Sequence, residues 1–112
     1  MSKYILLNIK PADSKYKLQA ELQEKLYSYI EGISMANSCT ALAVSGNENE
    51  VSCLLEISNK DITDIKLITA IKRNSERWLQ LQGKAYKDFT WNMLHKMEEI
   101  EEDRLEEVKR NL

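Results

Sequence analysis

The chain has 112 residues, of which 43% are hydrophobic and 30% are charged, with three glycines, one proline and a formal net charge of −2. This length and composition are typical of one ordered, helix-favouring domain and exclude an intrinsically disordered chain. The near-neutral charge predicts no general attraction to nucleic acid or to an anionic membrane.

The sequence contains no apolar run long enough to span a bilayer and no pattern of a secretory signal at its start. A soluble, cytoplasmic protein is therefore expected. Cys39 and Cys53 are too far apart for a CxxC redox or zinc pair. We expect both to be small buried hydrophobic side chains in strands, with a disulfide across a hairpin as the alternative.

The first half of the chain alternates between strand and helix patterns. Residues 4–10 alternate apolar and mixed positions and predict a strand that Pro11 ends. A helix follows from Asp13 or Ser14 to about Glu31, and Gly32 ends it. Residues 39–45 and 51–58 predict two strands joined by the turn-rich segment 46–50, which has the length of a hairpin connection.

Residues 61–83 predict an amphipathic helix that begins near Asp61 and ends at Gly83. Its apolar side is interrupted by two polar residues, Asn74 and Ser75. A further helix is predicted from Lys84 to about Arg110. Gly83 either separates two helices, which we favour, or loosens one long helix.

These elements predict an α+β fold of order β-α-β-β-α, followed by an acidic C-terminal helix. Two helices cover one face of a three-stranded sheet, as in a ferredoxin-like fold without its last strand. The first two strands are either parallel neighbours or separated by the third. Residues 1–83 form the core, and residues 84–112 form a helical extension of the same domain.

The other face of the sheet is too apolar to stay in water, because it carries Tyr4, Leu6 and Leu54. Either the C-terminal helix folds over it or another subunit covers it. Because the sheet also has open edges, we expect a homodimer or a heterodimer with a partner of similar fold. The expected interface consists of Tyr4, Leu6, Leu54, Asn74, Ser75, Trp78 and Trp91.

Each of these interface residues also has a structural interpretation. Nearby backbone groups could equally satisfy Asn74 and Ser75. Trp78 lies on the core stripe, which favours a structural role, whereas Trp91 fits the core and the interface equally.

The sequence contains no pair of nucleophile and base, so no catalytic residue, metal site or cofactor is predicted. His95, the only histidine, is expected to be a solvated helix residue. A basic patch could contact RNA phosphates or an acidic partner, although pairing with the acidic C-terminal helix is favoured. The patch consists of Lys66, Lys72, Arg73 and Arg77.

The hairpin and the helix that follows it resemble the Pcc family, the small dimerisation subunits of the KEOPS complex, which helps to install threonylcarbamoyl on tRNA adenosine. The resemblance rests on Gly46, Leu54 to Ile57, Asp64, Leu67, Asn74, Ser75, Arg77, Trp78 and Leu79. It implies a non-enzymatic, cytoplasmic interaction subunit of a tRNA-modifying assembly, or a diverged paralogue of such a subunit. Whether RNA is contacted directly stays open.

The alternative function is that of a small acidic inhibitor, such as a toxin immunity protein or a phage anti-defence protein. Its carboxylate-rich segment, Glu98 to Glu107, would then occupy a basic cleft on a target.

Overall fold

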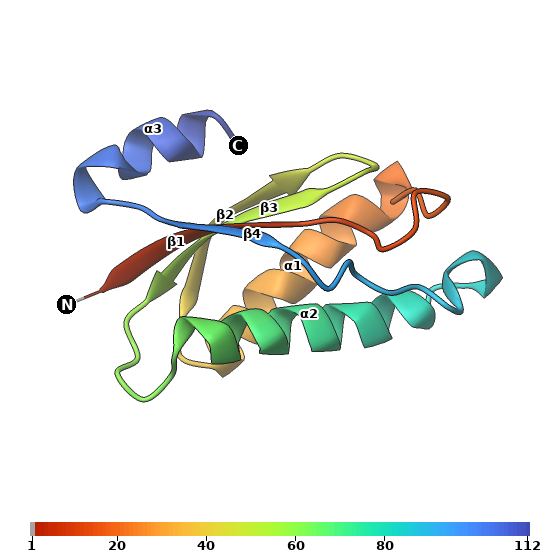
Figure 1. The fold of residues 1–112 in the computed structure, drawn as a ribbon, viewed down its shortest axis with the longest axis horizontal. Helices are drawn as coiled ribbons and strands as arrows, with labels where there is room; N and C mark the ends of the chain where they lie inside the picture. Colours follow the sequence, from red (N-terminus) through yellow and green to blue (C-terminus); the bar gives the residue numbers. More distant parts are fainter. Residues whose placement is uncertain (1) are drawn as a thin grey trace.

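The computed structural model describes residues 2–112, and Figure 1 shows their arrangement. The first elements are β1 (Lys3–Ile9), α1 (Ala20–Ala36), β2 (Thr40–Gly46), β3 (Val51–Ile57) and α2 (Asp64–Gln80). The predicted β-α-β-β-α order is confirmed. None of the helices in this part of the chain has the length and apolar character that crossing a membrane requires.

The predicted helix between Lys84 and Arg110 is wrong. α2 ends at Gln80 with Leu81 as its C-cap, and Gly83 follows just before the next turn with a φ of +132°, a conformation that favours glycine. The chain then forms the 3-10 turn η1 (Lys84–Tyr86), β4 (Lys96–Glu99), the 3-10 turn η2 (Glu102–Arg104) and the short helix α3 (Leu105–Arg110). The extension therefore adds a strand to the sheet, in place of one continuous helix.

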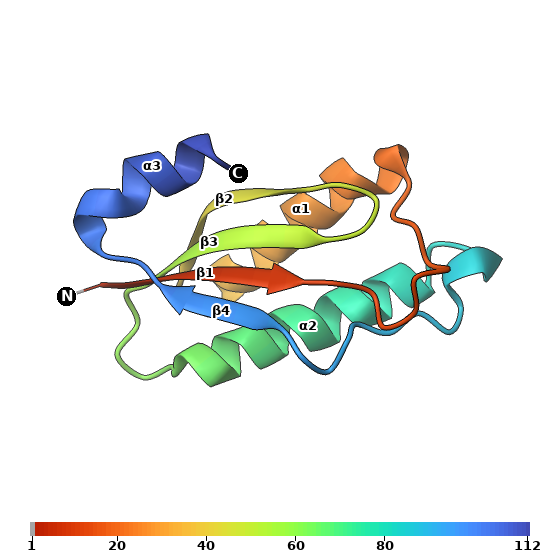
Figure 2. The ribbon, with the colours of Figure 1, turned by 45° about the horizontal axis from the view of Figure 1, so that its top comes forward.

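The sheet has four strands in the order β2-β3-β1-β4 (Figure 2). Every neighbouring pair is antiparallel. β3 thus lies between the first two strands, as one of the two predicted arrangements had it, and the parallel arrangement is wrong. β4 supplies the last strand of the ferredoxin-like order, which the sequence analysis expected to be missing.

Helices α1 and α2 cover one face of the sheet and enclose the main core. Alternate residues of β1 and β3 point into this core because successive side chains in a strand face opposite sides. Their side chains Ile5, Leu7, Ile9, Cys53, Leu55 and Ile57 are all buried in it. Cys39 and Cys53 are buried free thiols in this core, as predicted, but only Cys53 lies in a strand, because Cys39 precedes β2. Burial raises the pKa of the Cys53 thiol to about 12.

The C-terminal segment covers part of the opposite face. In Figure 1, α3 lies on the other side of the sheet from α1 and α2. Ile100 and Val108 pack there against the fully buried Leu54, with Tyr4 and Leu6 at the border of this second cluster. The sequence left open whether the C-terminal segment or another subunit covers this face. In the structure, the C-terminal segment covers part of it.

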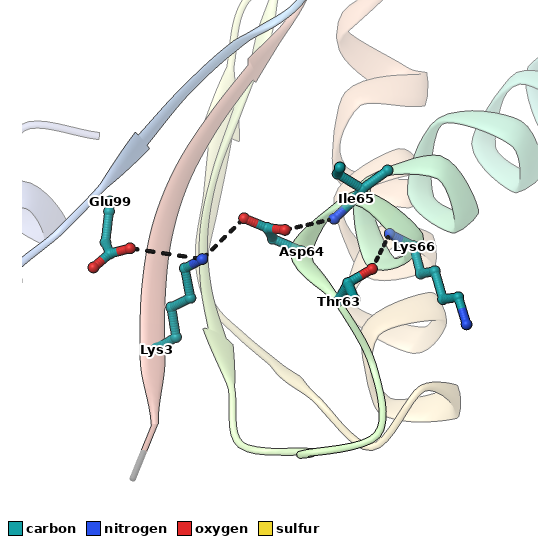
Figure 3. A network of polar contacts seen from close by, with 6 residues as sticks. All are labelled: Lys3, Thr63, Asp64, Ile65, Lys66 and Glu99. Carbon is teal, nitrogen blue, oxygen red and sulfur yellow. Dashed lines mark hydrogen bonds and ion pairs between the residues drawn. The ribbon is translucent and has the colours of Figure 1, made fainter.

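Lys3 connects three elements at one end of the sheet (Figure 3). Its Nζ lies 3.0 Å from Asp64 Oδ2 at the start of α2 and 3.6 Å from Glu99 Oε1 at the end of β4. The hydrogen bond raises the pKa of Lys3 and lowers the pKa of Asp64. Thr63 caps α2, because its Oγ1 accepts a hydrogen bond from the Lys66 N–H. The cap is therefore Thr63 and not the predicted Asp61.

Candidate functional site

A groove crosses the half of the sheet that α3 leaves uncovered. Its main cavity has a volume of about 330 Å³ and is lined by Leu6, Asn8, Lys10, Glu50, Ser52, Lys96, Met97 and Glu98. An adjoining cavity of about 190 Å³ shares Asn8, Lys10 and Lys96 and adds Asn92, Leu94 and His95. We call these two cavities together the open-face groove.

The polar floor of the open-face groove follows from the register of the sheet. Ser45 pairs with Ser52, Ser52 with Asn8, and Asn8 with Lys96. Four polar residues, one from each strand, thus lie in one row. Because Leu7 and Ile9 face the helices, their neighbours Asn8 and Lys10 belong to the opposite side.

The groove residues are linked to one another by polar contacts. Asn8 Nδ2 donates hydrogen bonds to Ser52 Oγ at 2.9 Å and to Glu50 Oε1 at 3.3 Å. Lys10 Nζ lies 3.8 Å from Glu50 Oε2. Gly46 closes the hairpin beneath this group, since a Cβ at that position would overlap the Glu50 carbonyl oxygen. The hairpin geometry therefore sets the place of Glu50.

His95 lies at the far end of the groove, beside a lysine from α2. Lys72 Nζ donates to the carbonyl oxygens of Asn92 at 2.8 Å and Met93 at 3.2 Å, and it lies 3.4 Å from His95 Nδ1. Partial burial, and then the charge of Lys72, lower the pKa of His95 below its usual 6.5. His95 is therefore neutral at pH 7 and gains a charge only in more acidic solution.

The groove differs in composition from a metal centre. Among residues 2–112, no three His, Cys, Asp and Glu side chains are placed to hold a metal ion. None of the groove residues is a tyrosine. The nearest phenol along β1 is Tyr4, whose hydroxyl lies 3.5 Å from Glu102, and burial followed by the charges of Glu56 and Glu102 raises its pKa.

The predicted interface residues are dispersed over the molecule. Tyr4, Leu6 and Leu54 border or lie beneath the C-terminal segment. Trp78 stacks on Tyr29 with ring centroids 5.4 Å apart, and Asn74 is half-buried on α2. Their roles in binding a partner stay predictions.

Ser75 and Trp91 form a buried contact with each other. Trp91 Nε1 donates to Ser75 Oγ at 2.9 Å, and the Ser75 hydroxyl donates to the Ile71 carbonyl oxygen. The alternative in which Ser75 is satisfied locally is therefore the arrangement in the structure.

The predicted basic patch lies on α2, on the other face of the sheet from the groove. Lys66, Arg73 and Arg77 are exposed there, whereas Lys72 reaches the loop before β4. Among the groove residues, Leu6, His95 and Glu98 were considered from the sequence, whereas the polar residues Asn8, Ser52 and Lys96 were not. The signal that could have revealed them is the placement of Asn8 and Ser52 at alternate positions of apolar strands.

Comparisons with known proteins point to one family. The sequence profile of the family described as "Transposase IS200 like" matches residues 7–111. A protein from Deinococcus radiodurans described as a transposase has a similar structure, with a TM-score of 0.77 and 16% identity over 99% of this chain and 88% of its own. No curated protein is significantly similar to the chain.

A second solved structure is a REP-associated tyrosine transposase bound to a REP hairpin. It has a TM-score of 0.71 and 10% identity, and the match covers 96% of this chain and 62% of that protein. At these identities, both solved structures establish a shared fold.

The family match overturns the function predicted from the sequence. The resemblance to the Pcc family, the KEOPS and tRNA-processing role and the acidic inhibitor are all wrong, because the matching profile and both structural neighbours are transposases. The prediction of a non-enzymatic protein is wrong for the same reason, since transposases are enzymes that cut DNA. Because the profile covers nearly its whole length, the chain belongs to the IS200-like transposase family.

Proposed function

We propose that the chain binds a DNA strand in the open-face groove, as a step of a reaction in which its family cuts DNA. The observation that carries this proposal is the groove itself. Its floor carries a row of polar side chains between apolar ones, it is the part of the sheet that α3 leaves open, and Lys10 and Lys96 line both of its cavities. A structural neighbour that holds a REP hairpin supports the same class of ligand.

The groove chemistry suits a single strand better than an intact duplex. Lysine ammonium groups bind phosphate oxygens, and the Asn8 and Ser52 side chains offer hydrogen bonds to the edge of a base. A cavity of about 330 Å³ has the size of a small-molecule site and admits a group of about one nucleotide. The bound base therefore has to be unpaired, as in a single strand or a hairpin loop.

Charge reversal in the groove tests this proposal. We expect Lys10→Glu and Lys96→Glu each to weaken binding of a fluorescent single strand of about 15 nucleotides by about tenfold or more. Lys25→Glu changes an exposed lysine on α1 and serves as the matched control, which should bind as the wild type does. Fluorescence anisotropy measures the affinity, and a gel of the same strand incubated with Mg²⁺ detects cutting. Unchanged affinity in both groove variants would exclude the groove as the binding site.

A second copy of the chain is the partner that we propose for the edge of β4. β4 is an outer strand of the sheet, and an outer strand offers unpaired backbone groups to another chain. Met93 and Leu94, just before it, are 91% and 83% exposed. Leu94→Arg is expected to shift the protein from dimer to monomer in light scattering, whereas Leu81→Arg, at another exposed leucine, is not.

A further inference from the structure

Asn8 occupies the centre of the open-face groove. It lines both cavities, and its register partners are Ser52 on one side and Lys96 on the other. A nucleotide whose phosphates contact Lys10 or Lys96 would therefore place its base near Asn8. The inference below rests on the proposed binding of DNA in this groove.

The orientation of the Asn8 amide is set by its neighbours. Its amino group provides two donors, and these meet Ser52 Oγ at 2.9 Å and Glu50 Oε1 at 3.3 Å. An ionised carboxylate only accepts hydrogen bonds, so a rotated amide would turn the Asn8 oxygen against the Glu50 oxygen. The other carboxylate oxygen of Glu50 lies 3.8 Å from Lys10 Nζ. Glu50 thus acts as a positioning residue for Asn8.

The carbonyl oxygen of Asn8 is left available to a ligand. Among residues 2–112, the only buried side-chain nitrogen or oxygen without a hydrogen-bond partner is the Tyr27 hydroxyl. Asn8 Oδ1 is not engaged by any of the side-chain contacts in this region, so it is accessible to solvent in the groove. At the floor of the groove, Asn8 therefore presents its carbonyl oxygen, a hydrogen-bond acceptor, to a ligand. The opposite orientation of the amide would have presented the amino group, a donor.

We infer that Asn8, held by Glu50, selects an unpaired cytosine or adenine by the amino group at position 4 or 6 of the base. The amino group of cytosine or adenine donates a hydrogen bond to such an acceptor, whereas thymine and uracil present a carbonyl oxygen at the corresponding position. Two acceptors facing each other exclude a hydrogen bond and leave both desolvated. Asn8 is thereby a specificity-determining residue of the proposed DNA site.

Cytosine and uracil provide a matched pair of ligands for the test. They have the same ring size, and neither carries the methyl group of thymine. They differ at position 4, where cytosine has an amino group and uracil a carbonyl oxygen, and at the neighbouring N3, which accepts a hydrogen bond in cytosine and donates one in uracil. We expect the wild type to bind an oligo-deoxycytidine strand about fivefold more tightly than an oligo-deoxyuridine strand of equal length. Anisotropy at one salt concentration measures both affinities.

Three variants separate the positioning role from simple stability. Asn8→Ala should bind both strands equally. Glu50→Gln should lose the preference, because an uncharged amide accepts either orientation of Asn8. Asn49→Ala, at an exposed asparagine of the same hairpin, should keep the preference, and circular dichroism verifies that all variants are folded.

The outcomes distinguish the two proposals. Equal wild-type affinity for the two strands, or a preference that persists in Asn8→Ala, overturns the inference and leaves DNA binding intact. Loss of the preference in Asn49→Ala as well would also overturn it, because the effect would then follow the hairpin and not the amide. No binding of either strand by the wild type overturns the proposed function and this inference together.

Discussion

At the scale of single residues, two hydrogen bonds account for the polar residue Ser75 on the apolar side of α2. Its hydroxyl returns a hydrogen bond to the Ile71 carbonyl and accepts one from the buried indole of Trp91. We predict that Ser75→Ala destabilises the protein by about 1–3 kcal/mol, because the indole N–H is then buried without an acceptor. Urea unfolding measures the change. Ser28→Ala, at an exposed serine of α1, is the control, and equal stability of the two variants would contradict this account.

His95 makes a prediction about pH at the same scale. Burial and the neighbouring Lys72 lower its pKa below 6.5, so the neutral form dominates at pH 7. As pH falls through this lowered value, His95 becomes positively charged next to Lys10 and Lys96, which line the same cavity. We predict that single-strand affinity rises by about fivefold between neutral and acidic solution. His95→Asn should remove most of this rise in anisotropy titrations, and an unchanged pH profile in that variant would exclude His95 as its source.

Element by element, the sequence predicted the parts of the fold whose pattern is local. β1, β3 and α2 have strong strand or helix periodicity, and their buried faces are the predicted ones. β4 has no such pattern, since its four residues, Lys96 to Glu99, are all exposed. It is a strand because β1 offers a free edge to it and because Ile100 is buried next to it. Such tertiary pairing overrides local propensity.

The candidate site was missed for a related reason. Asn8, Glu50, Ser52 and Lys96 come from three segments that are distant in the sequence. Asn8, Glu50 and Ser52 meet through the pairing of β1 with β3, but Lys96 joins them only because β4 pairs with β1. That side of the groove was invisible while residues 84–110 were interpreted as a helix.

The C-terminal segment makes a prediction at the scale of elements. Val108, only 8% exposed, packs against Leu54 and holds α3 on the sheet. We predict that Val108→Asp releases this segment, because burying an unpaired carboxylate is unfavourable. Dye binding to apolar surface should then increase, together with concentration-dependent association in size-exclusion chromatography. Asn111→Asp adds the same charge at an exposed position and should change neither measurement; parallel behaviour of the two variants would contradict the prediction.

For the whole molecule, the net charge of −2 constrains how DNA is bound. A globally acidic protein cannot attract a phosphate backbone from a distance, so binding has to depend on the few lysines that line the open-face groove. For single strands, log affinity falls with log salt concentration by about 0.7 per neutralised phosphate. Contacts from Lys10 and Lys96 therefore predict a slope of about −1.4. Anisotropy titrations over a series of salt concentrations measure it.

Removing the two lysines together gives the sharpest form of this prediction. The double variant Lys10→Ala and Lys96→Ala is expected to reduce the salt slope to near zero, because few phosphates would then be neutralised. Replacing Lys66 and Arg73, exposed residues of the basic patch on α2, by alanine should leave the slope unchanged. A slope that is unchanged in the groove variant and reduced in the α2 variant would show that the DNA strand binds on the helical side of the molecule. The comparison thus determines which of the two faces of the sheet carries the strand.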